Sequence, residues 1–213
     1  MLNLIYRVYE FSTHVGHNEP GFISATTVIS SLYKAKLTLE GTEKDACLIA
    51  PSLKRSSTIG SGFHLYAEKA LADDDSIQQE LYREKPLDDV VITGTCDLLV
   101  RQEDGRYKLG DWKTGYGKER SLDNLEKDSL QMSVYRWLLA DEYDIVDEAS
   151  ILFISQSNNV EKEYIVELKP VHIMDEWLKD RLYAIRKIDR SDCNDSVKYN
   201  ACNYCTFVCS ERK

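Results

Sequence analysis

Hydrophobic residues recur along the chain at two spacings, and the alternation of the two predicts an α/β protein. Apolar positions three or four residues apart, the spacing of a helix face, run through residues 56–75, 128–143 and 171–188. Another helix is predicted at 23–37, where Ser24 is a suitable N-cap. The final helix has the clearest apolar stripe, formed by Met174, Trp177, Leu178 and Leu182. Runs rich in β-branched residues, typical of strands, occupy 89–100, 106–114, 149–155 and 161–169.

The loops between these strands predict two hairpins. One crosses "QEDG", whose Asp-Gly pair is a strong turn signal, and the other crosses "QSNN". A two-residue turn centred on Asp104 and Gly105 would place Asp97 opposite Trp112.

Length and composition suit a single globular domain. The chain has 213 residues, of which 43% are apolar, so we expect one domain over 1–213 with its core at about 56–190. The longest apolar runs are far shorter than the roughly 20 residues that cross a bilayer, and the first residues lack the apolar centre of a signal peptide. We therefore expect a cytoplasmic protein without a membrane partner. A net charge of -9 argues against indiscriminate polyanion binding but leaves room for a local basic groove.

Three charged residues stand close together in the first predicted hairpin. Alternate residues of a strand share a face, so Asp111 and Lys113 point the same way and Trp112 points to the other side. The predicted pairing brings Asp97 diagonally next to both. Two neighbouring carboxylates repel unless a cation lies between them, and such hard ligands suit Mg²⁺ or Mn²⁺. A bare Asp-x-Lys is also common by chance, and the alternative is a solvated edge hairpin with a salt bridge.

The residues around this hairpin resemble the RecB-like branch of the PD-(D/E)xK nuclease superfamily. That branch has a G-x-x-x-H helix, a G-x-x-D strand, a D-x-K strand and a Q-x-x-x-Y helix in this order. The matching residues here are Gly60 to His64, Gly94 to Asp97, Asp111 to Lys113, and Gln131 to Tyr135. The resemblance implies a restriction-endonuclease-like core, a mixed β-sheet flanked by helices, and a metal-dependent DNA nuclease.

The resemblance also implies a role for each motif residue. A divalent ion, Mg²⁺ or Mn²⁺, would be bound by His64, Asp97, Asp111 and the carbonyl of Trp112. Catalysis would involve the two aspartates, with Lys113 acting on the attacking water and with Gln131 and Tyr135 orienting the site or the DNA.

Each of the less specific positions has an alternative interpretation. A single histidine on a helix, such as His64, is usually a core or surface residue. Gln131 and Tyr135 share a helical face with Leu138, so they also fit the polar margin of a buried stripe. Glu84, expected just before the first strand, is a further possible carboxylate of the site. A solvated surface charge is the simpler explanation for it.

Cysteines crowd the end of the chain, within 193–209. A C-x2-C pair can hold one metal centre from one turn, and four thiolates complete a zinc site or an iron-sulfur cluster. Some RecB-like nucleases, including CRISPR-associated adaptation nucleases, carry such a cluster with one distant N-terminal ligand. We expect a small C-terminal tip with a 4Fe-4S cluster, zinc being the alternative, in which Cys47 competes with Cys193 as fourth ligand. The ligands favoured are Cys193, Cys202, Cys205 and Cys209.

The family suggests an exonuclease on single-stranded DNA or DNA ends, acting in recombination, repair, or phage or CRISPR DNA processing in a bacterial, archaeal or phage-infected cell. DNA is the expected partner, with protein partners in a recombination or CRISPR complex. The competing class is a catalytically silent DNA- or protein-binding subunit of a nuclease assembly.

The chain has no G-x-x-x-x-G-K-[ST] loop, so it contains no ATP-driven motor of that type. Cys96 is expected in the core. The cations that would supply a positive lining for DNA are Lys34, Lys36, Lys54, Arg55, Lys118, Arg120 and Arg136.

Overall fold

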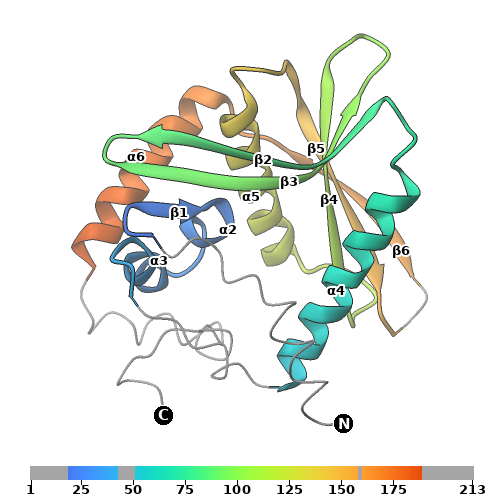
Figure 1. Cartoon of the computed structure of the whole chain (residues 1–213), viewed down its shortest axis with the longest axis horizontal. Coiled ribbons are helices and arrows are strands. Elements are labelled where there is room, and N and C mark those ends of the chain that lie inside the picture. Colours follow the sequence, from blue (N-terminus) through green and yellow to red (C-terminus); the bar gives the residue numbers. More distant parts are fainter. Residues whose placement is uncertain (1–18, 43–50, 158–159, 189–213) are drawn as a thin grey trace.

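A computed structural model describes residues 19–42, 51–157 and 160–188. Helices and strands alternate through these residues around one sheet (Figure 1). In chain order the elements are β1 (Phe22–Ser24), α2 (Ala25–Val28), α3 (Leu32–Leu39), α4 (Pro51–Ala70), β2 (Ile77–Leu87), β3 (Val90–Arg101), β4 (Tyr107–Gly115), α5 (Leu122–Leu139), β5 (Ile145–Ser155), β6 (Glu161–Glu167) and α6 (Val171–Lys187).

The sheet of the described residues is mixed and has six strands in the order β1-β3-β4-β5-β6, with β2 paired to β3. β1 runs parallel to β3, and β4 runs parallel to β5, whereas the β2–β3, β3–β4 and β5–β6 pairs are antiparallel. The parallel β4–β5 pair requires a crossover connection, and α5 provides it. The expected mixed sheet flanked by helices is therefore observed.

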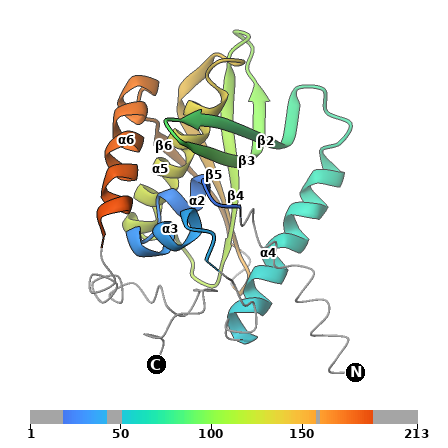
Figure 2. The ribbon, with the colours of Figure 1, turned by 60° about the vertical axis from the view of Figure 1, so that its left-hand side comes forward.

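Helices cover the two faces of the sheet unequally. Figure 2 shows α3, α5 and α6 on one side, while α4 stands alone on the other. The core lies between the sheet and α5 and α6, where Trp137, Met132, Leu178 and Leu182 are almost completely buried. The predicted stripe of α6 is confirmed, since its buried residues include Met174, Leu178 and Leu182, while Trp177 packs against the core's edge.

Several sequence predictions need correction. Ser24 is an N-cap, as expected, and its side chain accepts a hydrogen bond from the Thr27 amide, but the predicted helix at 23–37 is divided into α2 and α3. β1 and β2 were not predicted from the sequence. Glu84 therefore lies within β2, opposite Thr93, and not before the first strand. It is exposed, and its carboxylate accepts a hydrogen bond from the Tyr82 hydroxyl, in agreement with a solvated charge.

The register of the β3–β4 hairpin also differs from the prediction. The last pair before the loop is Arg101 with Tyr107, and the ladder ends at Leu98 with Gly110. The Gly105 amide donates to the Gln102 carbonyl, and Gly105 has a φ of +85°, which is the geometry of a three-residue loop. The prediction of a two-residue turn was wrong by one residue, and the pairing of Asp97 with Trp112 was wrong with it.

β3 and β4 diverge beyond the last pair of this ladder, Leu98 with Gly110, and we call this divergence the fork. One edge of β3 pairs with β2, while the other edge pairs with β1 at Val91–Thr93 and with β4 only from Leu98 onward. Residues 94–97 lie between these two pairings. β3 and β4 thus separate at the two motifs that contain Asp97 and Asp111.

Candidate active site

Asp97 lies at the fork between β3 and β4. Its Oδ2 accepts a hydrogen bond from the Trp112 amide at 2.8 Å, so a side chain takes the place of a strand carbonyl there. The Asp97 side chain is 11% exposed. The carboxylate is consequently fixed in position next to β4 while it remains accessible from one side.

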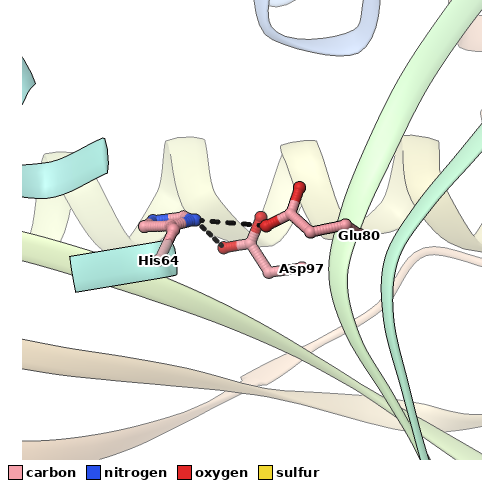
Figure 3. A group of neighbouring side chains, drawn as sticks. All are labelled: His64, Glu80 and Asp97. Atoms are coloured by element: carbon pink, nitrogen blue, oxygen red, sulfur yellow. Dashed lines mark ion pairs between the residues drawn. The ribbon is translucent and has the colours of Figure 1, made fainter. Parts of the chain in front are cut away.

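Three potential metal ligands converge on the solvent side of Asp97. His64 Nδ1, from α4, lies 3.6 Å from Asp97 Oδ2 and 3.5 Å from Glu80 Oε1. Figure 3 shows the three side chains pointing toward one another from α4, β2 and β3. One donor atom of each residue lies within 4.8 Å of the others. Glu80 was not predicted from the sequence, because the strand that carries it was missed.

A second set of polar side chains continues the site from β4 to α5. Lys113 Nζ lies 2.6 Å from Asp111 Oδ2 and donates to Gln131 Oε1 at 3.3 Å. Gln131 Nε2 in turn donates to the Tyr135 hydroxyl at 2.7 Å. Asp111 is almost completely buried, and its Oδ2 makes the ion pair but no hydrogen bond of good geometry. The prediction that Asp111 and Lys113 share a strand face agrees with this contact, and Gln131 and Tyr135 line the same site.

Close packing holds the elements of the site together. Trp112 points away from Lys113, and its ring meets the ring of Phe63 of α4 edge-on, with centroids 5.2 Å apart. A Cβ atom on Gly94 would lie 2.8 Å from side-chain atoms of both Tyr135 and Leu138, so only glycine allows β3 to approach α5 this closely. The glycine of the G-x-x-D motif therefore positions the Q-x-x-x-Y helix.

The ionisable groups of the site shift one another's pKa values. Burial, and then the neighbouring Asp111 carboxylate, raise the pKa of Asp97 from 3.8 to about 7. The Glu80 carboxylate raises the pKa of His64 against the opposing effect of burial. Burial, followed by Asp111, raises the pKa of Tyr135, which keeps its hydroxyl protonated. The Asp97 carboxylate is therefore repelled by Asp111, and a bound cation would offset this repulsion.

The residues present fit a divalent ion. The donors are carboxylates and one imidazole, a set that suits Mn²⁺, and also Mg²⁺ when water completes its shell. His64, Glu80 and Asp97 provide donors from one side. Asp111 and the Trp112 carbonyl lie on β4, across the fork from Asp97 of β3.

A buried ion pair adjoins this site on α5. Arg120 Nη2 donates to Asp128 Oδ1 at 2.9 Å, and Arg120 Nε lies 2.7 Å from Asp128 Oδ2. Two other cations considered for a positive lining also contact protein groups: Lys36 donates to the Ile188 carbonyl, and Arg136 donates to Asp147. These three cations are therefore engaged within the fold.

Of the six cysteines, Cys96 alone lies within the described residues. Cys96 is buried, its thiol donates to the Leu98 carbonyl at 3.2 Å, and burial raises its pKa, as expected of a core residue. Cys47, Cys193, Cys202, Cys205 and Cys209 lie outside the described residues. No helix in the described part of the chain is long and apolar enough to cross a membrane.

Comparison with known proteins places this geometry in a family. The family model described as "PD-(D/E)XK nuclease superfamily" matches residues 61–210. The crystal structure of SSO0001 is similar with a TM-score of 0.63 and 21% sequence identity, covering 99% of this chain and 95% of that chain, which indicates a shared fold. The crystal structure of Scheffersomyces stipitis Rai1 is a weak match, with a TM-score of 0.35 and 12% identity over 90% of this chain and 69% of that chain. No protein of curated function is a significant sequence match.

The family match spans most of the chain and contains the motifs identified in the sequence from His64 of α4 to Tyr135 of α5, all except Gly60, which lies one residue before the match begins. The fold and the family therefore agree with the resemblance first inferred from those motifs. The chain belongs to the PD-(D/E)XK nuclease superfamily.

Proposed function

We propose that this chain is a metal-dependent DNA nuclease that acts as an exonuclease on single-stranded DNA or DNA ends. The observation that carries the proposal is the position of Lys113, which lies between Asp111 and Gln131, on the strand next to Asp97. A solvated surface lysine needs no such partners. Nucleases of this superfamily use Mg²⁺ or a similar divalent ion.

His64, Asp97, Asp111 and the Trp112 carbonyl are the proposed ligands of that ion. A divalent ion bound there supplies positive charge to the scissile phosphate and to the attacking water. Asp97 must give up its proton for this, because a carboxylic acid is a poor ligand. Burial and the Asp111 carboxylate raise the pKa of Asp97 to about 7 in the metal-free site, so a metal ion competes with this proton near neutral pH.

Lys113 is the proposed catalytic cation. Its ammonium group stabilises negative charge that develops on the phosphate and orients the attacking water. Asp111 and Gln131 restrict the rotation of the lysine side chain, so the charge is already in place when substrate binds. Tyr135 acts one step further away, by holding the Gln131 amide through its hydroxyl.

The test is a cleavage assay with Mn²⁺ or Mg²⁺ on end-labelled and circular DNA, single- and double-stranded. We expect linear single strands or ends to be degraded and circular DNA to resist. Lys113→Ala should lower the rate by about 100-fold or more, a typical loss when one group stabilising charge is removed. The matched control is Lys108→Ala on the same strand, whose Nζ lies 4.0 Å from Glu163. Native-rate cleavage by Lys113→Ala would refute the assignment, and rapid cleavage of circles would refute the exonuclease.

A separate proposal concerns the cysteines at 193–209. Four thiolates from Cys193, Cys202, Cys205 and Cys209 saturate a 4Fe-4S or zinc centre and leave no position for water, so this centre is structural. Cys202→Ser should lower bound iron or zinc first and activity only with stability. Anaerobic purification with iron, sulfide and zinc analysis tests it, and metal-free protein with full stability would contradict it. Replacing Cys47 separately decides between the two candidates for the fourth ligand.

DNA recombination, repair, and phage or CRISPR DNA processing are the settings that the family resemblance suggests for this activity. Protein partners in such a complex are part of the same proposal. Co-purification of the full chain from its own host would identify them.

A further inference from the structure

Glu80 has a backbone conformation that an ordinary strand residue avoids. Its φ is +48°, in the left-handed region, although it lies in the middle of β2. The pairs on either side, Gln79 with Leu98 and Leu81 with Cys96, are regular, but Glu80 forms no pair with Asp97 between them. Such a conformation in a non-glycine residue costs about 1–3 kcal/mol and persists only where the surroundings impose it.

This conformation brings the Glu80 carboxylate to the imidazole of His64. The distance of 3.5 Å between Oε1 and Nδ1 is that of an ion pair, and the Glu80 side chain remains 41% exposed. An exposed ion pair stabilises a protein by about 1 kcal/mol at most. The contact with His64 therefore does not account for the strained backbone.

A cation bound by the Glu80 carboxylate would explain the strained backbone. His64, Glu80 and Asp97 come from three different elements, yet their donor atoms lie within 4.8 Å of one another, close enough to ligate one ion. Asp111 takes no part in this group, and its Oδ2 is paired with Lys113. A carboxylate from β2 thus supplies the charge on the side of Asp97 that faces away from Asp111.

We propose that Glu80 is a ligand of the divalent ion, together with His64 and Asp97. The proposal rests on the proposed function, since it adds a ligand to the metal centre of the same site. A ligand on β2 joins that strand to α4 through His64, so metal binding fastens α4 to the sheet. Glu80 is a residue that none of the four sequence motifs contains.

The test compares two carboxylates of the same strand in the full chain. Glu80→Gln keeps the size of the side chain and removes its charge, and Glu84→Gln is the control because Glu84 is exposed on β2 and contacts only Tyr82 among the hydrogen bonds described. Mn²⁺ affinity is measured by calorimetry, and the rise in Tm on adding Mn²⁺ is measured by thermal unfolding. We expect Glu80→Gln to weaken Mn²⁺ binding at least tenfold and to lose most of the rise in Tm, while Glu84→Gln stays within twofold of the native chain.

A second variant, Glu80→Gly, distinguishes loss of a metal ligand from loss of the folded structure. Glycine adopts a positive φ without strain, so Glu80→Gly should unfold at the same temperature as the native chain or above it in EDTA, with the same loss of Mn²⁺ affinity. Native Mn²⁺ affinity in either Glu80 variant overturns the proposal.

The outcomes also separate this proposal from the nuclease assignment. Mn²⁺ binding that depends on Glu80 in a native chain that cleaves no DNA supports the ligand and refutes the nuclease. Cleavage of DNA with Mn²⁺ binding that is independent of Glu80 refutes the ligand alone.

Discussion

Asp97→Asn should stabilise the metal-free protein while it abolishes metal binding. The introduced amide oxygen can still accept the hydrogen bond from the Trp112 amide, now made by the Asp97 carboxylate at 2.8 Å. The negative charge, which is buried beside Asp111, disappears. Replacing this proposed metal ligand should therefore raise the free energy of unfolding of the metal-free protein.

The size of this effect follows from the pKa of Asp97, which is about 7 in place of 3.8. At about 1.4 kcal/mol for each pH unit, ionising Asp97 in the folded state costs about 4 kcal/mol more than in the unfolded chain. Relaxation and water penetration reduce such costs, and we expect about half, ~2 kcal/mol. For a chain of this size that is a rise in Tm of about 4–8 °C.

The pH dependence has a definite sign. The folded protein holds the Asp97 proton more tightly than the unfolded chain, so stability is fully present below pH 3.8 and is lost as the pH rises to about 7. The raised pKa of His64 acts in the same direction, since its stabilising charge is lost above pH 6.5. The advantage of Asp97→Asn should grow over this window and level off above pH 7.

Thermal unfolding in EDTA at pH 5 and pH 8 measures the effect. We expect Asp97→Asn to exceed the native chain in Tm at pH 8, and to do so by less than half as much at pH 5. Saturating Mn²⁺ should reverse the order, because ligand at 100 times its Kd stabilises the native chain by about 2.7 kcal/mol and leaves the variant unchanged. A variant less stable than the native chain in EDTA at pH 8 would refute the reasoning.

Three further variants test neighbouring parts of the site. His64→Ala should weaken Mn²⁺ binding more than Mg²⁺ binding, because imidazole contributes more to the softer ion; equal losses by calorimetry would contradict its role as a ligand. Arg120→Ala should cost about 2 kcal/mol in urea unfolding because it leaves the Asp128 carboxylate buried without its counter-ion, whereas Asp147→Asn, whose side chain is 81% exposed, should change little. Gly94→Ala should cost about 1–3 kcal/mol by overpacking against α5, and Gly62→Ala, with no atom within 4 Å of the added Cβ, is its control; equal Tm values for the two would disprove the packing argument.

The sequence predicted the helices and strands that carry strong periodicity, and it missed those that depend on tertiary pairing. β2 reads "IQQELYREKPL", with four charged residues, two glutamines and a proline among its 11 residues, so its composition does not indicate a strand. It is a strand because β3 pairs with it along its length. Glu80 could not be predicted for the same reason, since a left-handed residue within an unrecognised strand leaves no periodic signal.

The site itself was easier to find than the pairing that forms it. The pairing of Asp111 with Lys113 follows from strand alternation and the choice of Asp97 from motif order, and neither depends on register. The hairpin register was wrong because an Asp-Gly pair fits both a two-residue turn and the three-residue loop observed at Gly105. Only the positions of the flanking strands, which lie outside the local sequence, distinguish the two loops.

The hydrogen bond from the Trp112 amide to Asp97 makes this amide a natural spectroscopic reporter of the site. Its acceptor is a carboxylate whose charge changes near neutral pH and on metal binding, whereas the amides of the regular ladder have carbonyl acceptors with a constant charge. The chemical shift and hydrogen-exchange rate of a single backbone proton should therefore follow protonation and occupancy of the centre. Because the proton belongs to the backbone, it can be observed without any label or substitution at the ligands themselves.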